Sequence, residues 1–263
     1  MDNFTPRRLV AAAVCLVLAL AVTSVGPVRA AAAAPLPKIM SAADFAALCN
    51  TNLGFTISVN TLVTGGSGTI NPYACQVHVA AFVNLTFDQV SLDSPKGSNV
   101  GLLVDGGEGS QVHVHQSTMV MDGGLFLEPG GHEPDHIDAN NALLEVAQST
   151  LRSTAPGGEV RLLASTCMDG GSVQVSQSEI SAPSVVYIFA STGTDPAQRC
   201  VGSNGTVQVT QSAITVTVGP IVIATGKGGQ TTALQNTFAP SGAQIMGGAS
   251  CKAVANLPES PCS

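Results

Sequence analysis

The sequence has few charged and few aromatic side chains. Only 10% of its 263 residues are charged, 4% are aromatic, and tryptophan is absent. An ordinary soluble domain is about one quarter charged, so this composition excludes coiled coils and long solvated helices. The formal net charge is −7, and a chain without excess positive charge has no electrostatic footprint for nucleic acid. With 44% apolar side chains, the chain is also too hydrophobic to be intrinsically disordered.

Long apolar runs are scarce as well. The longest is Leu9 to Val22, which follows Arg7 and Arg8 and precedes small residues around Ala30. This is the layout of a secretory signal peptide, and the run is shorter than a typical membrane-spanning helix. We therefore expect residues 1–30 to be a signal peptide and the protein to be secreted, extracellular or at the cell surface. The mature chain is expected to be soluble; an uncleaved membrane anchor is the alternative.

In place of charge, the chain carries a recurring signature of eight residues: apolar, any, apolar, any, Gln, small polar, any, apolar. Hairpin meanders need no common signature, whereas a stacked solenoid does, because equivalent positions of successive coils form columns. A second short apolar run follows most copies, at a spacing of about 29 residues, which is typical of short buried strands. The clearest copies are Val112–Met119, Leu144–Leu151, Val173–Ile180 and Val207–Ile214, and the weaker ones are Phe55–Leu62, Val83–Val90 and Thr231–Phe238.

This repeat pattern resembles the right-handed parallel β-helix of the pectin-lyase-like superfamily. The resemblance covers residues 55–250 and implies an all-β, single-domain solenoid of about seven coils. A capping-box pattern at Ser41 and Asp44 predicts that a short N-terminal helix within residues 31–54 caps the first coil, and residues 251–263 are expected to close the other end. Signature positions one and three are expected inside, and positions two and four outside. Position six predicts a small polar column at a bend, formed by Asn60, Asp88, Ser117, Ser149, Ser178, Ser212 and Asn236.

Six cysteines remain after signal removal, an even number that suggests three disulfides in an oxidising compartment. Because four of them precede neighbouring copies by six to eight residues, we expect them at equivalent corners of adjacent coils. The expected pairs are Cys49–Cys75 and Cys167–Cys200, with Cys251–Cys262 left as the remainder. Asn84 and Asn204 begin glycosylation motifs that apply if the host is eukaryotic.

The histidines concentrate in one part of the chain and suggest a site. His113 and His115 occupy outward positions two and four of one strand, and Glu145 occupies position two of the next coil. The preceding loop adds His132, Asp135 and His136. Imidazole favours Zn²⁺ and Cu²⁺, so a metal site is predicted from His113, His115, His132, His136 and Glu145. The alternatives are an acid–base site of His113, His115, Asp135, His136 and Glu145, or an ordinary solvated surface.

The resemblance to the pectin-lyase-like superfamily suggests two alternative functions. Lyases of the superfamily typically hold Ca²⁺ on several Asp residues and use Arg or Lys as the base, and its hydrolases use clustered Asp residues. The outward signature positions here contain one carboxylate, Glu145, and neither Arg nor Lys. We therefore expect an adhesive, structural or glycan-contacting solenoid, whose partners are extracellular polysaccharides or surface components. The alternative is a carbohydrate-active enzyme of the lyase, hydrolase or epimerase type, with its site around residues 113–145.

Overall fold

A computed structural model describes residues 36–52, 54–71, 74–130, 140–165, 168–191 and 202–263. The chain divides into two compact units, 1–36 and 37–263, and the described residues belong almost wholly to the second. Within this described part, no helix combines the length and the apolar character needed to cross a bilayer. The predicted signal peptide lies outside the described residues.

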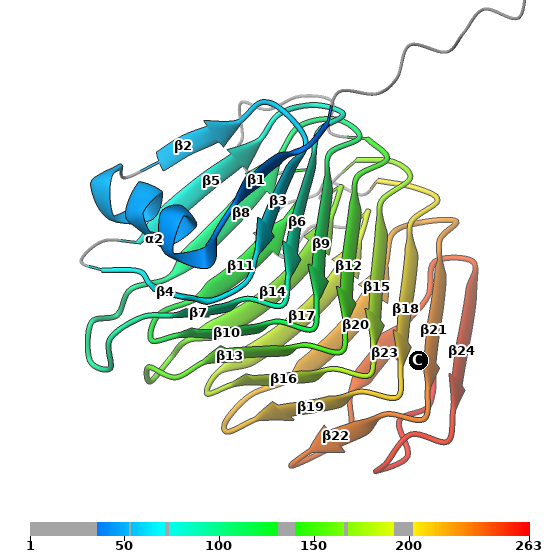
Figure 1. The fold of residues 1–263 in the computed structure, drawn as a ribbon. Coiled ribbons are helices and arrows are strands. Elements are labelled where there is room, and N and C mark those ends of the chain that lie inside the picture. The colour runs from blue at the N-terminus through cyan, green and yellow to red at the C-terminus, as the bar shows by residue number, and fades with distance from the viewer. Residues whose placement is uncertain (1–35, 53, 72–73, 131–139, 166–167, 192–201) are drawn as a thin grey trace, which may run out of the picture. The chain divides into compact units, whose positions relative to one another are not determined.

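The second unit is an all-β structure of three sheets, and the strands of its described residues pair in parallel (Figure 1). We name them sheets A, B and C. The strands of sheet A are β1 (Lys38–Met40), β3 (Thr61–Thr64), β6 (Asn84–Asp88), β9 (Gln111–His115), β12 (Leu143–Ala147), β15 (Ser172–Ser176), β18 (Thr206–Thr210), β21 (Gln230–Leu234) and β24 (Ser250–Val254).

Sheets B and C have the same construction. The strands of sheet B are β2 (Gly54–Ile57), β5 (Cys75–Val79), β8 (Leu102–Gly106), β11 (Leu125–Glu128), β14 (Glu159–Ala164), β17 (Val185–Ala190), β20 (Ile221–Thr225) and β23 (Gln244–Met246). The strands of sheet C are β4 (Ser67–Thr69), β7 (Ser91–Asp93), β10 (Thr118–Met121), β13 (Thr150–Ser153), β16 (Glu179–Ala182), β19 (Ala213–Val216) and β22 (Thr237–Ala239).

From β3 onward, the chain visits the sheets in a fixed order: A, then C, then B, then A again. Each strand therefore pairs with the strand three places earlier and three places later. This topology is consistent with a parallel β-solenoid, in which each coil contributes one strand to every sheet. Sheet A also extends beyond the repeat predicted over residues 55–250, because β1 and β24 pair with β3 and β21.

Side chains along each strand point alternately inward and outward, and the inward ones form the core. In β9, Val112 and Val114 are fully buried, while the side chains between and beside them face outward. In β12, Leu144 and Val146 continue the same two inward columns. The four clear copies of the signature are therefore in register, as predicted.

The two weak copies before them are out of register. Val112 pairs with Leu85, so the second copy begins two residues later than predicted, and Phe55 lies in sheet B rather than sheet A. The predicted polar column consequently loses Asn60 and Asp88, and Asp88 instead pairs with His115 on the outward side. A shift of two residues preserves the alternation of faces, so alternation alone did not reveal the error.

Two columns of polar side chains run along the bend between sheets A and C. The inner column is buried, and each member accepts a hydrogen bond from the backbone N–H of the coil before; for example, Ser149 Oγ accepts from Ser117 N at 3.1 Å. The outer column is an exposed ladder of amides, in which Gln116 donates to Gln148 at 3.1 Å and Gln148 donates to Gln177 at 3.2 Å. These glutamines have positive φ, 52° at Gln148, so each bend is made by one left-handed residue.

Helix α2 (Ala42–Thr51) packs on the first coils. Ser41 is its N-cap, and the reciprocal hydrogen bonds between Ser41 and Asp44 form the predicted capping box. Phe45 is fully buried and meets the Phe87 ring edge-on at 5.1 Å between centroids. The disulfide Cys49–Cys75 ties α2 to β5.

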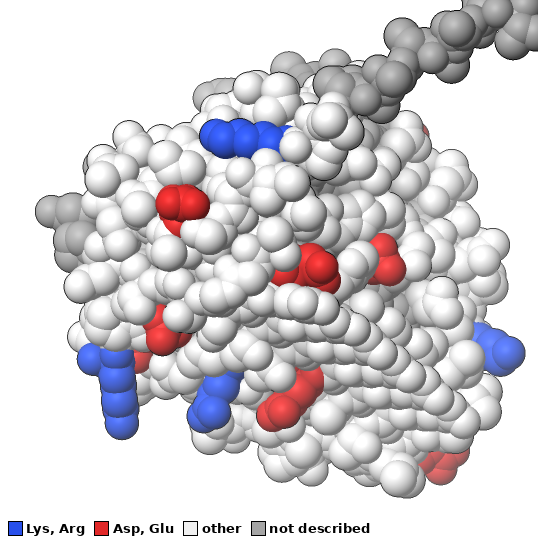
Figure 2. All heavy atoms as spheres, in the orientation of Figure 1, with Lys and Arg blue, Asp and Glu red and all other residues white. Residues whose placement is uncertain are grey.

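The second disulfide, Cys251–Cys262, lies at the other end of the unit. Both bridges are pairs that the sequence predicted. The third predicted pair, Cys167–Cys200, lies outside the described residues. On the face seen in Figure 2, the charged side chains are scattered over a mostly uncharged surface and form no basic patch.

Candidate metal-binding site

The outer face of sheet A brings three predicted ligand residues together. His113 and His115 belong to β9, and Glu145 belongs to the neighbouring strand β12, directly opposite His113 in the parallel register. Because side chains alternate along a strand, Val112 and Val114 enter the core and both imidazoles stay outside. Both strands belong to clear copies of the repeat, which align in register.

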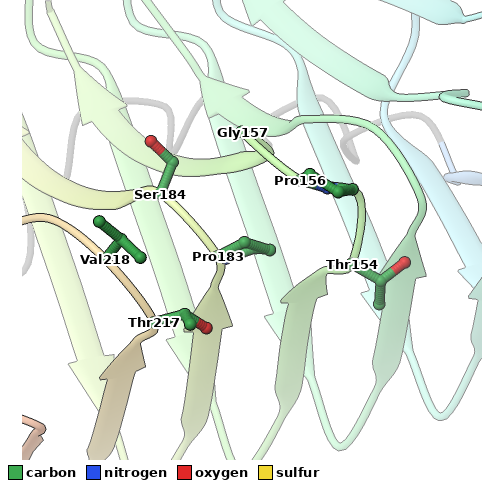
Figure 3. A pocket seen from close by; sticks show the side chains of 7 residues that line it. All are labelled: Thr154, Pro156, Gly157, Pro183, Ser184, Thr217 and Val218. Carbon is green, nitrogen blue, oxygen red and sulfur yellow. The ribbon is translucent and has the colours of Figure 1, made fainter.

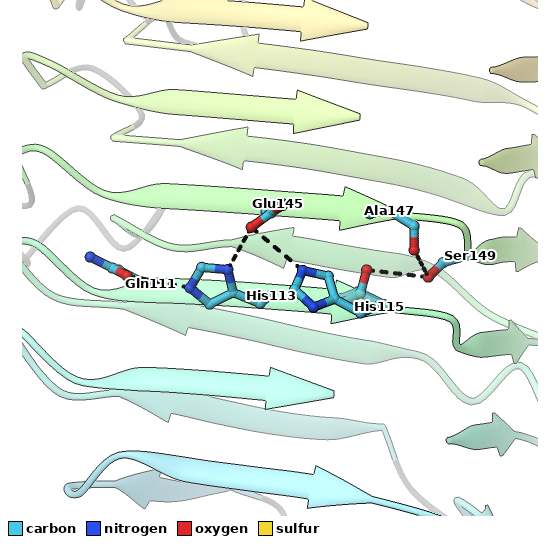
Figure 4. Close-up of polar contacts among 7 residues, drawn as sticks. Gln111, His113, His115, Glu145, Ala147 and Ser149 are labelled. Atoms are coloured by element: carbon cyan, nitrogen blue, oxygen red, sulfur yellow. Dashed lines mark hydrogen bonds and ion pairs between the residues drawn. The ribbon is translucent and has the colours of Figure 1, made fainter. Parts of the chain in front are cut away.

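The geometry converges on the Glu145 carboxylate, as Figure 4 shows. Its Oε2 atom lies 3.0 Å from His113 Nδ1 and 3.4 Å from His115 Nε2. The two imidazole rings meet edge-on, with 5.8 Å between centroids. One ligand atom from each of the three residues can be chosen so that all lie within 4.8 Å of one another.

The side chains are accessible but not fully solvated. The exposed fractions are 17% for His113, 36% for His115 and 37% for Glu145. His115 Nε2 is itself buried, and among the described residues its contact is the 3.4 Å approach to Glu145 Oε2, which is too long and poorly aligned for a full hydrogen bond. A metal ion bound between the imidazole and the carboxylate would satisfy this nitrogen more fully.

The Glu145 carboxyl is held in its ionised form. Partial burial raises its pKa. The hydrogen bond with His113 and the charge interactions with both imidazoles together lower it by more, so the pKa lies below its ordinary value. An ionised carboxylate is the form that ligates a metal. It is unsuited to general acid catalysis, which needs a proton on the group at the working pH.

The surroundings of His113 favour the same arrangement. When Nδ1 faces the carboxylate, the other ring nitrogen, Nε2, lies 3.3 Å from Gln111 Oε1. Histidines that ligate metals usually donate the second ring N–H to an oxygen, which fixes the tautomer and the ring orientation. Gln111 therefore supplies the supporting contact that a metal-bound His113 needs.

The other predicted site residues have different outcomes. His132, Asp135 and His136 lie outside the described residues, so their places in the metal and acid–base hypotheses remain predictions. Asn84 is half-buried in β6 and Asn204 is exposed, and glycosylation of either remains a prediction.

The sequence reasoning missed a second cluster of ionisable groups, on the outer face of sheet B. His78, Asp105 and Glu128 occupy equivalent positions of β5, β8 and β11. Asp105 precedes two glycines and Glu128 precedes Pro129 and Gly130, which favours a turn or loop at both residues. The structure instead places both in strands. The detectable signal is that each follows the apolar run of its coil directly.

A hollow of about 580 Å³ lies at the turns from sheet C to sheet B (Figure 3). Its lining contains no histidine, cysteine or charged side chain, so it offers no metal ligand and no acid–base group. The lining residues are Thr154, Pro156, Gly157, Pro183, Ser184, Thr217 and Val218.

Comparison with known proteins adds no relative: no family model, no curated protein and no solved structure matches this chain.

Proposed function

We propose that this protein is a secreted, non-catalytic β-solenoid whose outer sheet A face binds a divalent transition-metal ion, Zn²⁺ or Cu²⁺. The ligands are His113, His115 and Glu145. The observation that carries the proposal is the convergence of their three ligand atoms within 4.8 Å. Atoms bound at about 2.0–2.1 Å to a tetrahedral zinc lie roughly 3.4 Å apart, so side-chain shifts on the order of 1 Å complete the site.

We infer a right-handed parallel β-helix of about seven coils, of the pectin-lyase-like kind, with α2 as the N-terminal cap. The three parallel sheets and the packing of Phe45 on the first coils support this reading. The two disulfides support an oxidising, extracellular location. The partners we propose are extracellular polysaccharides or surface components that contact the polar face around the metal.

Calorimetry tests the metal site directly. Zn²⁺ and Cu²⁺ are titrated into the mature chain and into the double variant His113→Ala/His115→Ala. We expect binding of about one ion per chain to the mature chain and its loss in the double variant. The matched control is Gln174→Ala, which alters the outward position beside Glu145 in the next strand, β15, and should bind normally. Equal binding by the mature chain and the double variant would remove the proposal.

The competing function is a carbohydrate-active enzyme acting through the same residues. The lowered pKa of Glu145 counts against a hydrolase, which needs a general acid, but it leaves a role as the base of a lyase or epimerase open to test. A screen on pectate, alginate and related polysaccharides distinguishes the two. Release of new unsaturated or reducing ends, abolished by His113→Ala, would replace the binding role with catalysis.

A further inference from the structure

The ionisable cluster on the outer face of sheet B differs from the metal site because it is buried. Asp105 is 5% exposed and Glu128 is 3% exposed, although both side chains leave the strand on the outward side. The two residues are directly paired in the register of β8 and β11, so their backbones are about 4.8 Å apart. Two carboxyl groups are therefore held next to each other away from water.

The two carboxyl groups are unequally supplied with partners. Asp105 Oδ1 lies 2.6 Å from His78 Nδ1, and Asp105 Oδ2 accepts from Gln76 Nε2 at 3.2 Å. Glu128 Oε1 is buried and has no hydrogen-bond partner within the part of the chain that the structure describes. A charge on Asp105 is therefore compensated, whereas a charge on Glu128 is not, and a carboxyl in such a place keeps its proton.

The positive side chain of Arg161 offsets this only in part. Arg161 of β14 bonds to Glu159 at 2.6 Å and 2.8 Å, and its guanidinium lies 4.9 Å from the centre of the Phe126 ring. Among the described residues, the charged or titratable groups around Glu128 are thus His78, Asp105, Glu159 and Arg161. Burial raises the pKa of Glu128 to about 7; Arg161 opposes this effect, while the carboxylates of Asp105 and Glu159 add to it.

We propose that the Asp105–Glu128 pair is a pH-dependent switch: a proton on Glu128 holds the ends of β8 and β11 together, and loss of that proton opens them. With the proton present, one carboxyl is neutral and the pair is stable in its dry setting. Without it, two carboxylates lie on neighbouring strands, and Arg161, which is already paired with Glu159, offsets the charge on Glu128 only in part. The structure relieves this by admitting water at the ends of β8 and β11, where Gly130 N donates to Gly106 O at 3.1 Å.

Hydrogen exchange at different pH values tests the switch. Exchange of the mature chain is followed from pH 5 to pH 8.5, after correction for the intrinsic pH dependence of amide exchange. We expect segments 102–107 and 125–130 to lose protection by about tenfold or more across neutral pH, while segment 143–147 of sheet A changes little. Glu128→Gln has no titratable group at position 128, so the protection of these two segments should not change with pH. The exposed Glu179→Gln is the matched control and should behave like the unaltered chain.

A second variant keeps the test decisive if Glu128→Gln does not fold. Asp105→Asn removes the neighbouring charge and should move the opening transition to lower pH. A carboxyl ¹³C titration of the unaltered chain reads Glu128 directly. Protection that changes equally in the unaltered chain and in Glu128→Gln, or titration of Glu128 in the ordinary range of glutamate, would overturn the switch.

Discussion

The outer faces of sheets A and B place the same residue types in opposite environments. On sheet A, Glu145 lies between two histidines at a half-exposed position and is ionised; on sheet B, Glu128 lies beside Asp105 at a buried position and retains its proton to about neutral pH. Both glutamates leave parallel strands of one solenoid on the outward side. The difference shows that burial and neighbouring charge, rather than residue type or position on a strand, decide the chemistry of these groups.

The largest expected effect on binding is the loss of metal affinity when Glu145 is neutralised. Glu145→Gln keeps the shape of the side chain but removes the charge and one strong ligand. We expect the affinity for Zn²⁺ to fall by about 100-fold, close to 2.7 kcal/mol, as measured by calorimetry.

The comparison of the two faces supplies the control. Glu128→Gln should bind Zn²⁺ normally, because Glu128 is absent from the ligand set. If both variants bound more weakly by similar factors, the faces would be coupled and the contrast between them would be wrong.

The next effect concerns stability and belongs to sheet B. A carboxyl whose pKa is raised in the folded state contributes most to stability below its unfolded pKa, and that contribution falls as pH rises toward 7. From the ordinary value of 4.5 to about 7, the loss is roughly 3 kcal/mol. Glu128→Gln should therefore be about 3 kcal/mol more stable than the unaltered chain at pH 8, and nearly equal to it at pH 4.5, in urea unfolding.

Carboxyls with lowered pKa act in the opposite direction and set the window for this measurement. Glu145 and the capping Asp44 contribute stability that is lost as pH falls through their folded pKa values. Their influence lies below the ordinary carboxyl range. Histidines can change charge between pH 5 and pH 8, so Glu128 is isolated by the difference in stability between the unaltered chain and Glu128→Gln over this interval. An unaltered chain that becomes more stable across this interval, relative to Glu128→Gln, would contradict the assignment.

The contrast between the two faces also explains what the sequence could predict. His113, His115 and Glu145 were located because the signature fixes both their register and their outward direction. Glu128 and Asp105 follow runs that carry no shared polar signature, so their common position directly after the apolar run was the one indication that they pair across strands. Their burial depends on the folded surroundings of sheet B, which a repeat pattern does not encode.

The bends show the same limit. The buried column at Ser117, Ser149 and Ser178 was predicted because small polar residues recur there. The left-handed conformation of the glutamine before each of them was not, since glutamine has no marked preference for positive φ. Its explanation is the amide ladder, in which each side chain bonds to those of the adjacent coils.

Of the two polar columns at the bends, the inner, buried column should have the larger effect on stability. Ser149→Ala removes the acceptor for Ser117 N and the donor to Ala147 O, which are 3.1 Å and 2.8 Å away. A buried N–H that loses its partner costs about 1–3 kcal/mol, so we expect a destabilisation of about 2 kcal/mol in urea unfolding. Ser176→Ala, at an outward position of β15, is the control and should change stability by less than about 0.5 kcal/mol.

The smallest expected effect comes from the exposed ladder, at Gln148. Replacing it with glycine removes two exposed amide bonds, but glycine adopts φ of 52° without strain. The relief of about 1 kcal/mol offsets the lost bonds and the greater freedom of glycine in the unfolded chain. Gln148→Gly should therefore remain within about 0.5 kcal/mol of the unaltered chain, whereas Gln148→Ala, which loses the ladder and keeps the strain, should be less stable.

The difference between these two variants separates backbone strain from the ladder itself. If Gln148→Gly destabilised the chain as much as Ser149→Ala does, the exposed amides would stabilise the bend as strongly as the buried hydroxyls. Burial would then not be what distinguishes the inner column from the outer one. The same reasoning would extend to the two sheet faces, because the contrast between Glu128 and Glu145 also depends on the greater energetic effect of a polar group that is kept from water.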